Sequence, residues 1–292
     1  MTRLRHAIRQ VMGNQSLRKV EAGWLLAVAS EWAYLVSLLV YAYDVGGVLA
    51  VGLVSTMRTL PAAIAAPFLS SFSDRLPRER VLVAVHACRG LAVGAAALAV
   101  GANLSVAVVV AVAVVEGIVA TLHRPTTMSM LPTLAKSPEE LIASNAVTST
   151  GEAIGLLMGP AVGGLLLTIG GPPLGLFVPA VAFIAASATV LRVDSRGAAG
   201  APNTAPARAS SMLAGFAALR SYPSAGALVA IFISQTFVRG TLTVLLVAAS
   251  VELLGLGRSG VVGGSIGVAL FGTLFNTRLA AELAGTAGAG LS

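Results

Sequence analysis

The feature that most constrains this chain is a series of long apolar runs, separated by short segments rich in charge, glycine or proline. A helix of about 20 apolar residues crosses the roughly 30 Å hydrocarbon core of a bilayer. We therefore expect membrane-spanning helices, with a longer polar stretch at 123–144 between the fourth and the fifth. The expected spans are 22–43, 48–70, 81–100, 104–122, 145–169, a sixth from the turn at 170–173 to Leu191, 225–250 and 261–275.

Composition supports a membrane protein over a soluble one. Hydrophobic residues make up 56% of the 292 residues and charged residues 11%, whereas soluble domains average about 45–50% apolar and about 25% charged. A soluble fold this apolar would need an exterior as apolar as its interior. The expected fold class is therefore an all-α membrane protein.

The positions of the basic residues predict the orientation. With a cytoplasmic N-terminus, 15 of the 19 Lys and Arg residues fall on the cytoplasmic side and one, Arg258, on the other. Such asymmetry is the usual orientation signal of a multi-pass protein of the plasma (inner) membrane. The net charge of +7 is then explained by contact with the lipid surface, and we expect no nucleic-acid partner.

Several function classes have no support in the sequence. It contains no phosphate-binding loop and no nucleophile elbow. The single cysteine, Cys88, forms no disulfide within the chain, and no His or Cys spacing suggests a metal site. We expect no cofactor, no metal and no enzyme activity.

The sharpest motif is a glycine series in the fifth span, where Gly151, Gly155, Gly159 and Gly163 recur every fourth residue and Pro160 follows the third. This spacing places the glycines on one helix face, which lets a neighbouring helix approach closely. The proline removes a backbone hydrogen bond and favours a bend. A plain packing face is the simpler interpretation.

With its Gly-Pro-x-x-Gly-Gly segment, this span resembles the antiporter signature in the fifth helix of major facilitator superfamily exporters. The turn at 70–80 resembles the loop between helices two and three of that superfamily. The resemblance implies that Asp74, Arg75 and Arg78 form a cytoplasmic latch between helices. Segments at 131–146 and 235–240 resemble the branch that includes enterobactin exporters.

The resemblance also implies a domain organisation. The superfamily has two six-helix halves joined by a cytoplasmic linker. We expect a basic N-terminus at 1–21, a six-helix half at 22–191 and a linker at 192–220. Two helices of an incomplete second half at 221–277 and a tail at 278–292 would follow, as in a chain truncated after its eighth helix.

Ionisable residues within the spans are candidates for a substrate or proton pathway, because charge inside a bilayer is costly and usually functional. The strongest candidate is Glu31, with Arg58 or Arg89 as its partner, and a static structural pair is the alternative. Arg89 and Glu152 lie nearer the expected cytoplasmic ends, where their side chains would reach the interface. His86 suggests a proton relay or, more simply, an interfacial residue. The six are Glu31, Arg58, Arg89, Glu116, Glu152 and Arg239, all but Glu152 assigned to the pathway.

The resemblance therefore implies a secondary transporter that moves small amphipathic molecules, such as drugs or siderophores, out of the cell. Coupling to protons is implied by the resemblance alone and by no matching coupling residue. The arginine that many antiporters carry in helix four is absent from the segment around Glu116. The alternative is a truncated, transport-inactive membrane protein.

Overall fold

The computed structural model describes residues 9, 11–73, 75–191, 193, 226–227, 229–231, 233–238 and 240–241. Asp74 and Arg239 lie outside the described residues. So do the linker apart from Val193, the expected eighth span and the tail. The described part of the expected seventh span is helical.

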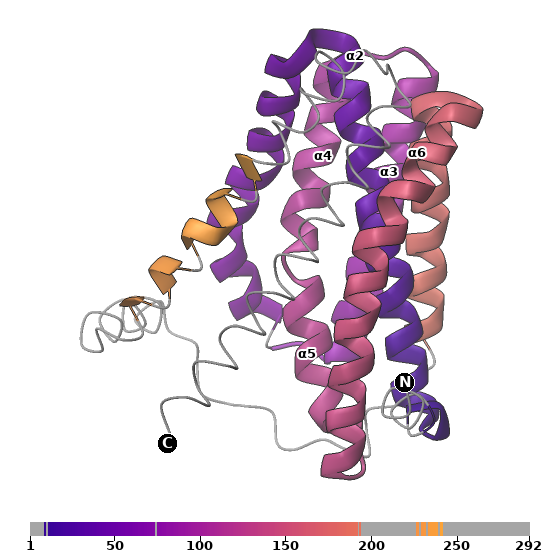
Figure 1. The fold of residues 1–292 in the computed structure, drawn as a ribbon, viewed down its shortest axis with the longest axis vertical. Coiled ribbons are helices and arrows are strands. Elements are labelled where there is room, and N and C mark those ends of the chain that lie inside the picture. Colours follow the sequence, from indigo (N-terminus) through magenta and orange to yellow (C-terminus); the bar gives the residue numbers. More distant parts are fainter. Residues whose placement is uncertain are drawn as a thin grey trace, which may run out of the picture.

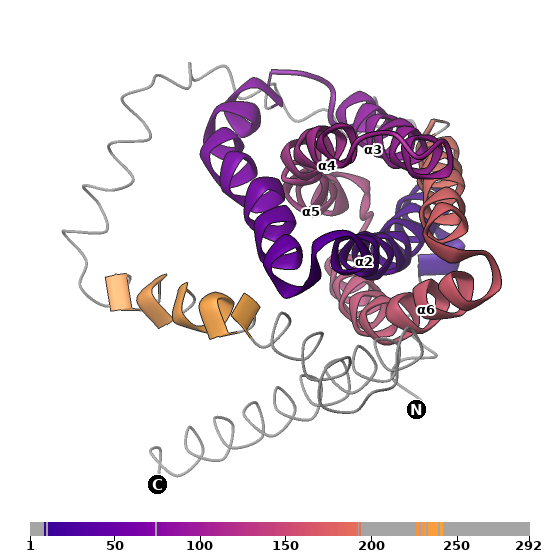
Figure 2. The same cartoon turned by 90° about the horizontal axis from the view of Figure 1, so that it is seen from above.

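Five helices follow one another along the chain and pack side by side (Figures 1 and 2). They are α2 (Gln15–Ser73), α3 (Arg78–Gly101), α4 (Val106–Ala120), α5 (His123–Leu134) and α6 (Pro138–Val190). The described residues contain four helices long and apolar enough to cross a membrane, with α4 and α5 counted as one from Val106 to Leu134. The all-α fold predicted from the sequence is confirmed.

Pairs of glycines divide the two longest helices into antiparallel arms. In α2 the helical geometry breaks at Gly46 and Gly47, and in α6 it breaks at Gly170 and Gly171. Gly47 and Gly171 have φ of 64° and 66° with ψ of −157° and −167°, a region of backbone conformation that is almost restricted to glycine and costs other residues about 1–3 kcal/mol. The turns expected here are confirmed. The described helices thus form six membrane-length segments: the two arms of α2, then α3, then α4 together with α5, and the two arms of α6.

The polar stretch expected between the fourth and fifth spans is largely helical, so that expectation is wrong. Helix α5 continues the fourth span to Leu134, and α6 begins at Pro138 after Ser137, whose hydroxyl accepts a hydrogen bond from the backbone N–H of Glu140 at 3.2 Å. The polar side chains of α5 misled the prediction, because several of them are buried against the bundle. These are His123, Thr126 and Thr127.

The glycine face of α6 packs against the first arm of α2. A Cβ added at Gly159 would lie 2.5 Å from Trp32 Cβ, and one at Gly163 would lie 2.8 Å from the Ala33 carbonyl oxygen. Separations below about 3 Å do not occur between real side chains, so only glycine permits this approach. The close packing fixes the first arm of α2 in the middle of the bundle.

The exterior is as apolar as the interior. Phe183 and Leu176 are fully buried, whereas Leu98, Leu91 and Phe68 are each about two-thirds exposed or more. In water such a surface would drive aggregation, but in lipid it costs nothing. The described residues therefore have the surface of a protein embedded in a bilayer.

Candidate functional site

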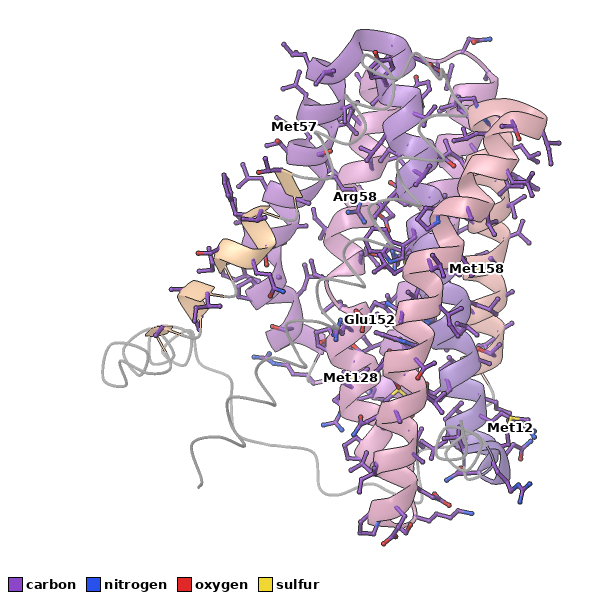
Figure 3. The ribbon with its side chains drawn as sticks, viewed as in Figure 1. Met12, Met57, Arg58, Met128, Glu152 and Met158 are labelled. Carbon is purple, nitrogen blue, oxygen red and sulfur yellow. The ribbon has the colours of Figure 1, made fainter. Side chains whose placement is uncertain are left out.

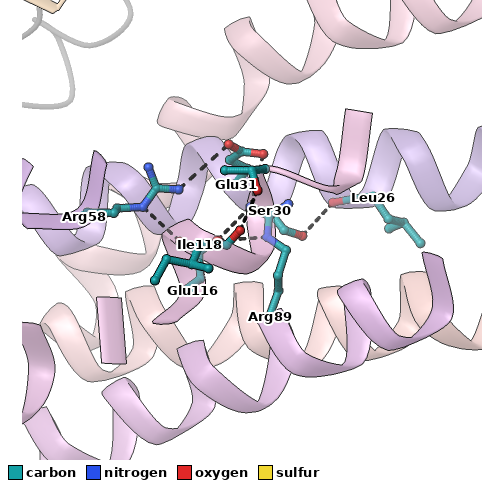
Figure 4. Close-up of polar contacts among 8 residues, drawn as sticks. Leu26, Ser30, Glu31, Arg58, Arg89, Glu116 and Ile118 are labelled. Atoms are coloured by element: carbon teal, nitrogen blue, oxygen red, sulfur yellow. Dashed lines mark hydrogen bonds and ion pairs between the residues drawn. The ribbon is translucent and has the colours of Figure 1, made fainter. Parts of the chain in front are cut away.

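Four charged side chains from four helical segments meet in the interior of the bundle (Figure 4). Glu31 comes from the first arm of α2, Arg58 from its second arm, Arg89 from α3 and Glu116 from α4. We call these four residues the charge quartet. It holds two carboxylates and two guanidinium groups, so its formal charge is zero.

Glu116 is the most tightly held member of the quartet. Its Oε1 lies 2.9 Å from Arg89 Nε and 2.8 Å from Arg89 Nη2, and its Oε2 accepts from Arg58 Nε at 2.9 Å. The side chains of Glu116 and Arg89 are fully buried, and that of Arg58 is 12% exposed. Short contacts from both arginines compensate for the large cost of removing these charges from water.

Glu31 is held more loosely and is the most accessible member. Its Oε2 lies 3.1 Å from Arg89 Nη2, its Oε1 lies 4.0 Å from Arg58 Nη2, and 31% of its side chain is exposed. One carboxylate of the quartet is thus locked between two arginines, while the other is partly exposed.

Aromatic rings and a glycine position the two arginines. The guanidinium carbon of Arg89 lies 4.3 Å from the centre of the Phe183 ring, and that of Arg58 lies 5.7 Å from the Tyr34 ring, within the range of cation–π attraction. A Cβ at Gly117 would lie 2.5 Å from the Arg58 carbonyl oxygen. The absence of a side chain there lets α4 approach α2 closely enough for Glu116 to reach Arg58.

The sequence identified the members of the quartet, but not their grouping. Both expected partners of Glu31 contact it, with Arg89 nearer than Arg58. The expectation that Arg89 reaches the membrane interface is wrong, because its side chain has no exposed surface. Glu116 was predicted as a pathway residue without a partner, and it binds both arginines. Arg239 lies outside the described residues.

Arg75 and Arg78, the two described latch residues, lie at the opposite end of the bundle from the Gly46–Gly47 turn. Arg75 and Arg78 are exposed, and Arg78 Nη1 donates a hydrogen bond to the Ser129 carbonyl oxygen of α5 at 2.7 Å. This contact joins the start of α3 to α5. The latch function of Arg75, Arg78 and the undescribed Asp74 stays a prediction.

A second ion pair lies on the surface of the bundle. Arg124 Nη1 of α5 is 2.6 Å from Glu152 Oε1 of α6, and the side chains are 64% and 40% exposed. Figure 3 labels Glu152 of this surface pair and, for comparison, Arg58 of the charge quartet. Arg124 belongs to the polar stretch expected at 123–144, and it lies in helix α5. Glu152 thus has a basic partner on the neighbouring helix α5.

Sequence analysis missed a buried carboxylate, Glu21, because it precedes the expected first span. Ser144 and Thr148 of α6 both donate hydroxyl hydrogen bonds to it. Ser144 and Thr148 are four residues apart and therefore lie on one helix face. This spacing is the sequence feature that could have indicated a shared buried partner. The interfacial assignment of His86 is also wrong, since His86 is fully buried beside His123.

Comparison with known families supplies the classification. The model of the Major Facilitator Superfamily matches residues 22–290. The chain belongs to the major facilitator superfamily. It is a membrane transporter of that superfamily, and the charge quartet lies among the helices of its N-terminal part.

Proposed function

We propose that this major facilitator superfamily protein is a proton-coupled exporter of small amphipathic molecules, such as drugs or siderophores. It works in the plasma membrane with its N-terminus in the cytoplasm. The observation that carries the proposal is the unequal burial of the two carboxylates in the charge quartet: Glu116 is fully buried, and Glu31 is 31% exposed.

Unequal burial gives the quartet two charge states. Glu31 is 31% exposed, so a proton can reach it, whereas Glu116 is shielded by three short contacts with arginine nitrogens. A proton on Glu31 leaves two arginines facing one carboxylate, and the quartet gains a net positive charge. The partial exposure of Glu31 limits the cost of this charge, but the cost still shifts the balance between two arrangements of the helices. Proton binding therefore favours a rearrangement of the helices that carry the quartet.

The direction of transport rests on the resemblance of the α6 glycine face to the antiporter signature. Gly155, Gly159 and Gly163 hold α6 against α2 at distances that a larger residue would not allow. In this arrangement Pro160 lies next to the contact with Trp32 and Ala29 and marks the place where α6 would bend. Antiport of a proton against an outgoing solute is the function that these features support.

The orientation rests on the position of the cations. Apart from the quartet and Arg124, the described Lys and Arg residues lie near the helix ends remote from the two Gly-Gly turns. The positive-inside rule assigns that end to the cytoplasm. Fusion of a reporter at Asp44 and another at Lys136 tests this assignment, because the two reporters must report opposite faces.

The experiment that tests transport uses the full chain in proteoliposomes with an acidic lumen. Ethidium, a cationic amphipathic dye, and a catecholate siderophore serve as the two solutes. We expect gradient-driven accumulation that collapses when nigericin removes the pH gradient. The Glu31→Gln variant should lose the gradient dependence. The matched control, Glu139→Gln, replaces an exposed carboxylate at the start of α6 and should retain it.

Two results would contradict the proposal. If neither solute moves in response to the gradient, the transport-inactive alternative is favoured. If Glu31→Gln accumulates both solutes as fast and as far as the unmodified protein, Glu31 has no part in coupling, and the quartet is a structural feature.

A further inference from the structure

The unsatisfied polar atoms of the bundle gather at one place. Among the buried side chains that the structure describes, only three carry polar nitrogens without a hydrogen-bonding partner in the protein: His86, Arg89 and His123. Buried polar groups in proteins are nearly always hydrogen-bonded, either to the protein or to internal water. Two contacting histidines and an arginine one helical turn from His86, all with unpaired nitrogens, therefore point to a polar ligand between them.

The three side chains are adjacent. His86 and Arg89 are one turn apart on the same face of α3, and the rings of His86 and His123 meet edge to face with centres 4.9 Å apart. Both nitrogens of His86 and Nε2 of His123 lack partners, while Nη2 of Arg89 already faces Glu31 and Glu116. Nη1 of Arg89 is thus the guanidinium nitrogen left without an acceptor.

Two aromatic side chains border this place. The Trp24 ring of α2 lies 4.7 Å from the His123 ring and donates its own N–H to the Thr148 carbonyl oxygen. Phe183 of α6 covers one side of Arg89. The charged groups that act on the two imidazoles are Arg89 and, for His123, also Arg124. Both are positive, so an anion is attracted here, but a resident cation is disfavoured.

We propose that His86, His123 and Nη1 of Arg89 enclose a buried water site next to the charge quartet. Water is the ligand that fits these atoms, because it accepts from the guanidinium N–H and both donates to and accepts from neutral imidazoles. A fixed anion fits less well, because two carboxylates already neutralise the two arginines of the quartet.

The site gives Arg89 a second source of solvation. One side of its guanidinium group binds the two carboxylates, and the other side binds water. When Glu31 takes up a proton, as the proposed function requires, Arg89 loses part of its compensation from the Glu31 carboxylate. Water at Nη1 then stabilises the positive charge that the carboxylate no longer compensates. The occupancy or order of the water site therefore rises with protonation of Glu31.

Water-edited solid-state NMR of the full chain in lipid bilayers, labelled with ¹⁵N-histidine and with ¹³C at the leucine and valine methyl groups, tests the site. The chain has three histidines, and variants His86→Phe and His123→Phe assign their signals. We expect polarisation to pass from water to His86 and His123 even though both are buried. Each variant should reduce the transfer to the remaining buried histidine by about half. The reason is that the bound water loses one of the two or three side chains that hold it in place. His6→Phe is the matched control and should change neither.

Transfer to His86 and His123 no faster than to the buried methyl groups of the core would overturn the proposal. If His86→Phe fails to fold, His86→Asn restores a polar group and should recover the water signal at His123; its failure to do so in a folded protein would also overturn the site. The link to Glu31 is tested by Glu31→Gln, which should increase transfer to His86, and an unchanged signal would refute that link. None of these measurements requires transport, so the water site and the exporter function can fail separately.

Discussion

Replacing Glu116 by glutamine should destabilise the protein far more than replacing Glu31, although both are carboxylates of one quartet. Glu116 makes three contacts of 2.8–2.9 Å with arginine nitrogens and is fully buried. Breaking a buried ion pair by removing one partner costs about 3–5 kcal/mol, because it leaves the other charge uncompensated. Glu31 has one contact at 3.1 Å and one at 4.0 Å and remains partly exposed. We expect its loss to cost about 1 kcal/mol, as for partly solvated pairs.

Thermal unfolding in detergent micelles measures the difference. For a protein of this size about 1 kcal/mol corresponds to about 2–4 °C in Tm, so Glu116→Gln should lower Tm by about 6–20 °C and Glu31→Gln by only a few degrees. A double-mutant cycle with Arg58→Gln should give a coupling energy of about 1–3 kcal/mol for the Arg58–Glu116 pair. Equal Tm values for the two single variants would show that burial does not decide the strength of these contacts.

Three other substitutions test the packing and the surface. Gly159→Ala places a Cβ 2.5 Å from Trp32 Cβ, so the helices must separate, and we expect a loss of about 1–3 kcal/mol in chemical denaturation. Gly47→Ala should cost about 1–3 kcal/mol, because the residue at this turn has φ of 64° and ψ of −157°. Glu152→Gln breaks the exposed pair with Arg124 and should change the unfolding free energy by less than about 1 kcal/mol.

Two glycines supply matched controls for the packing variants. A Cβ at Gly151 would meet only side-chain atoms at 3.6 Å or more, so Gly151→Ala should be tolerated where Gly159→Ala is not. A Cβ at Gly52 meets nothing within 4 Å in a helical segment, and Gly52→Ala should be neutral or stabilising. A loss at Gly151 equal to that at Gly159 would mean that the close approach of the helices does not decide the cost of substitutions on this face.

The turns and the membrane class could be predicted from the sequence because both depend on local information. Paired glycines at 46–47 and 170–171 break the helices where the apolar runs are interrupted, and each apolar run is long enough to span a bilayer. The extent of the fourth span could not be predicted, since His123 and Thr127 are polar residues buried by other helices. Hydropathy measures a residue's own side chain, whereas burial depends on residues distant in the sequence.

The grouping of the quartet shows the same limit at the level of the site. Each of Glu31, Arg58, Arg89 and Glu116 could be identified singly, because a charge within an apolar span is costly wherever it lies. Which carboxylate would be shielded and which would stay partly exposed depends on how closely the helices approach, and Gly117 sets that approach through its contact with Arg58. A residue with no side chain thus determines which carboxylate the arginines enclose and, on the proposed function, which one is free to exchange a proton.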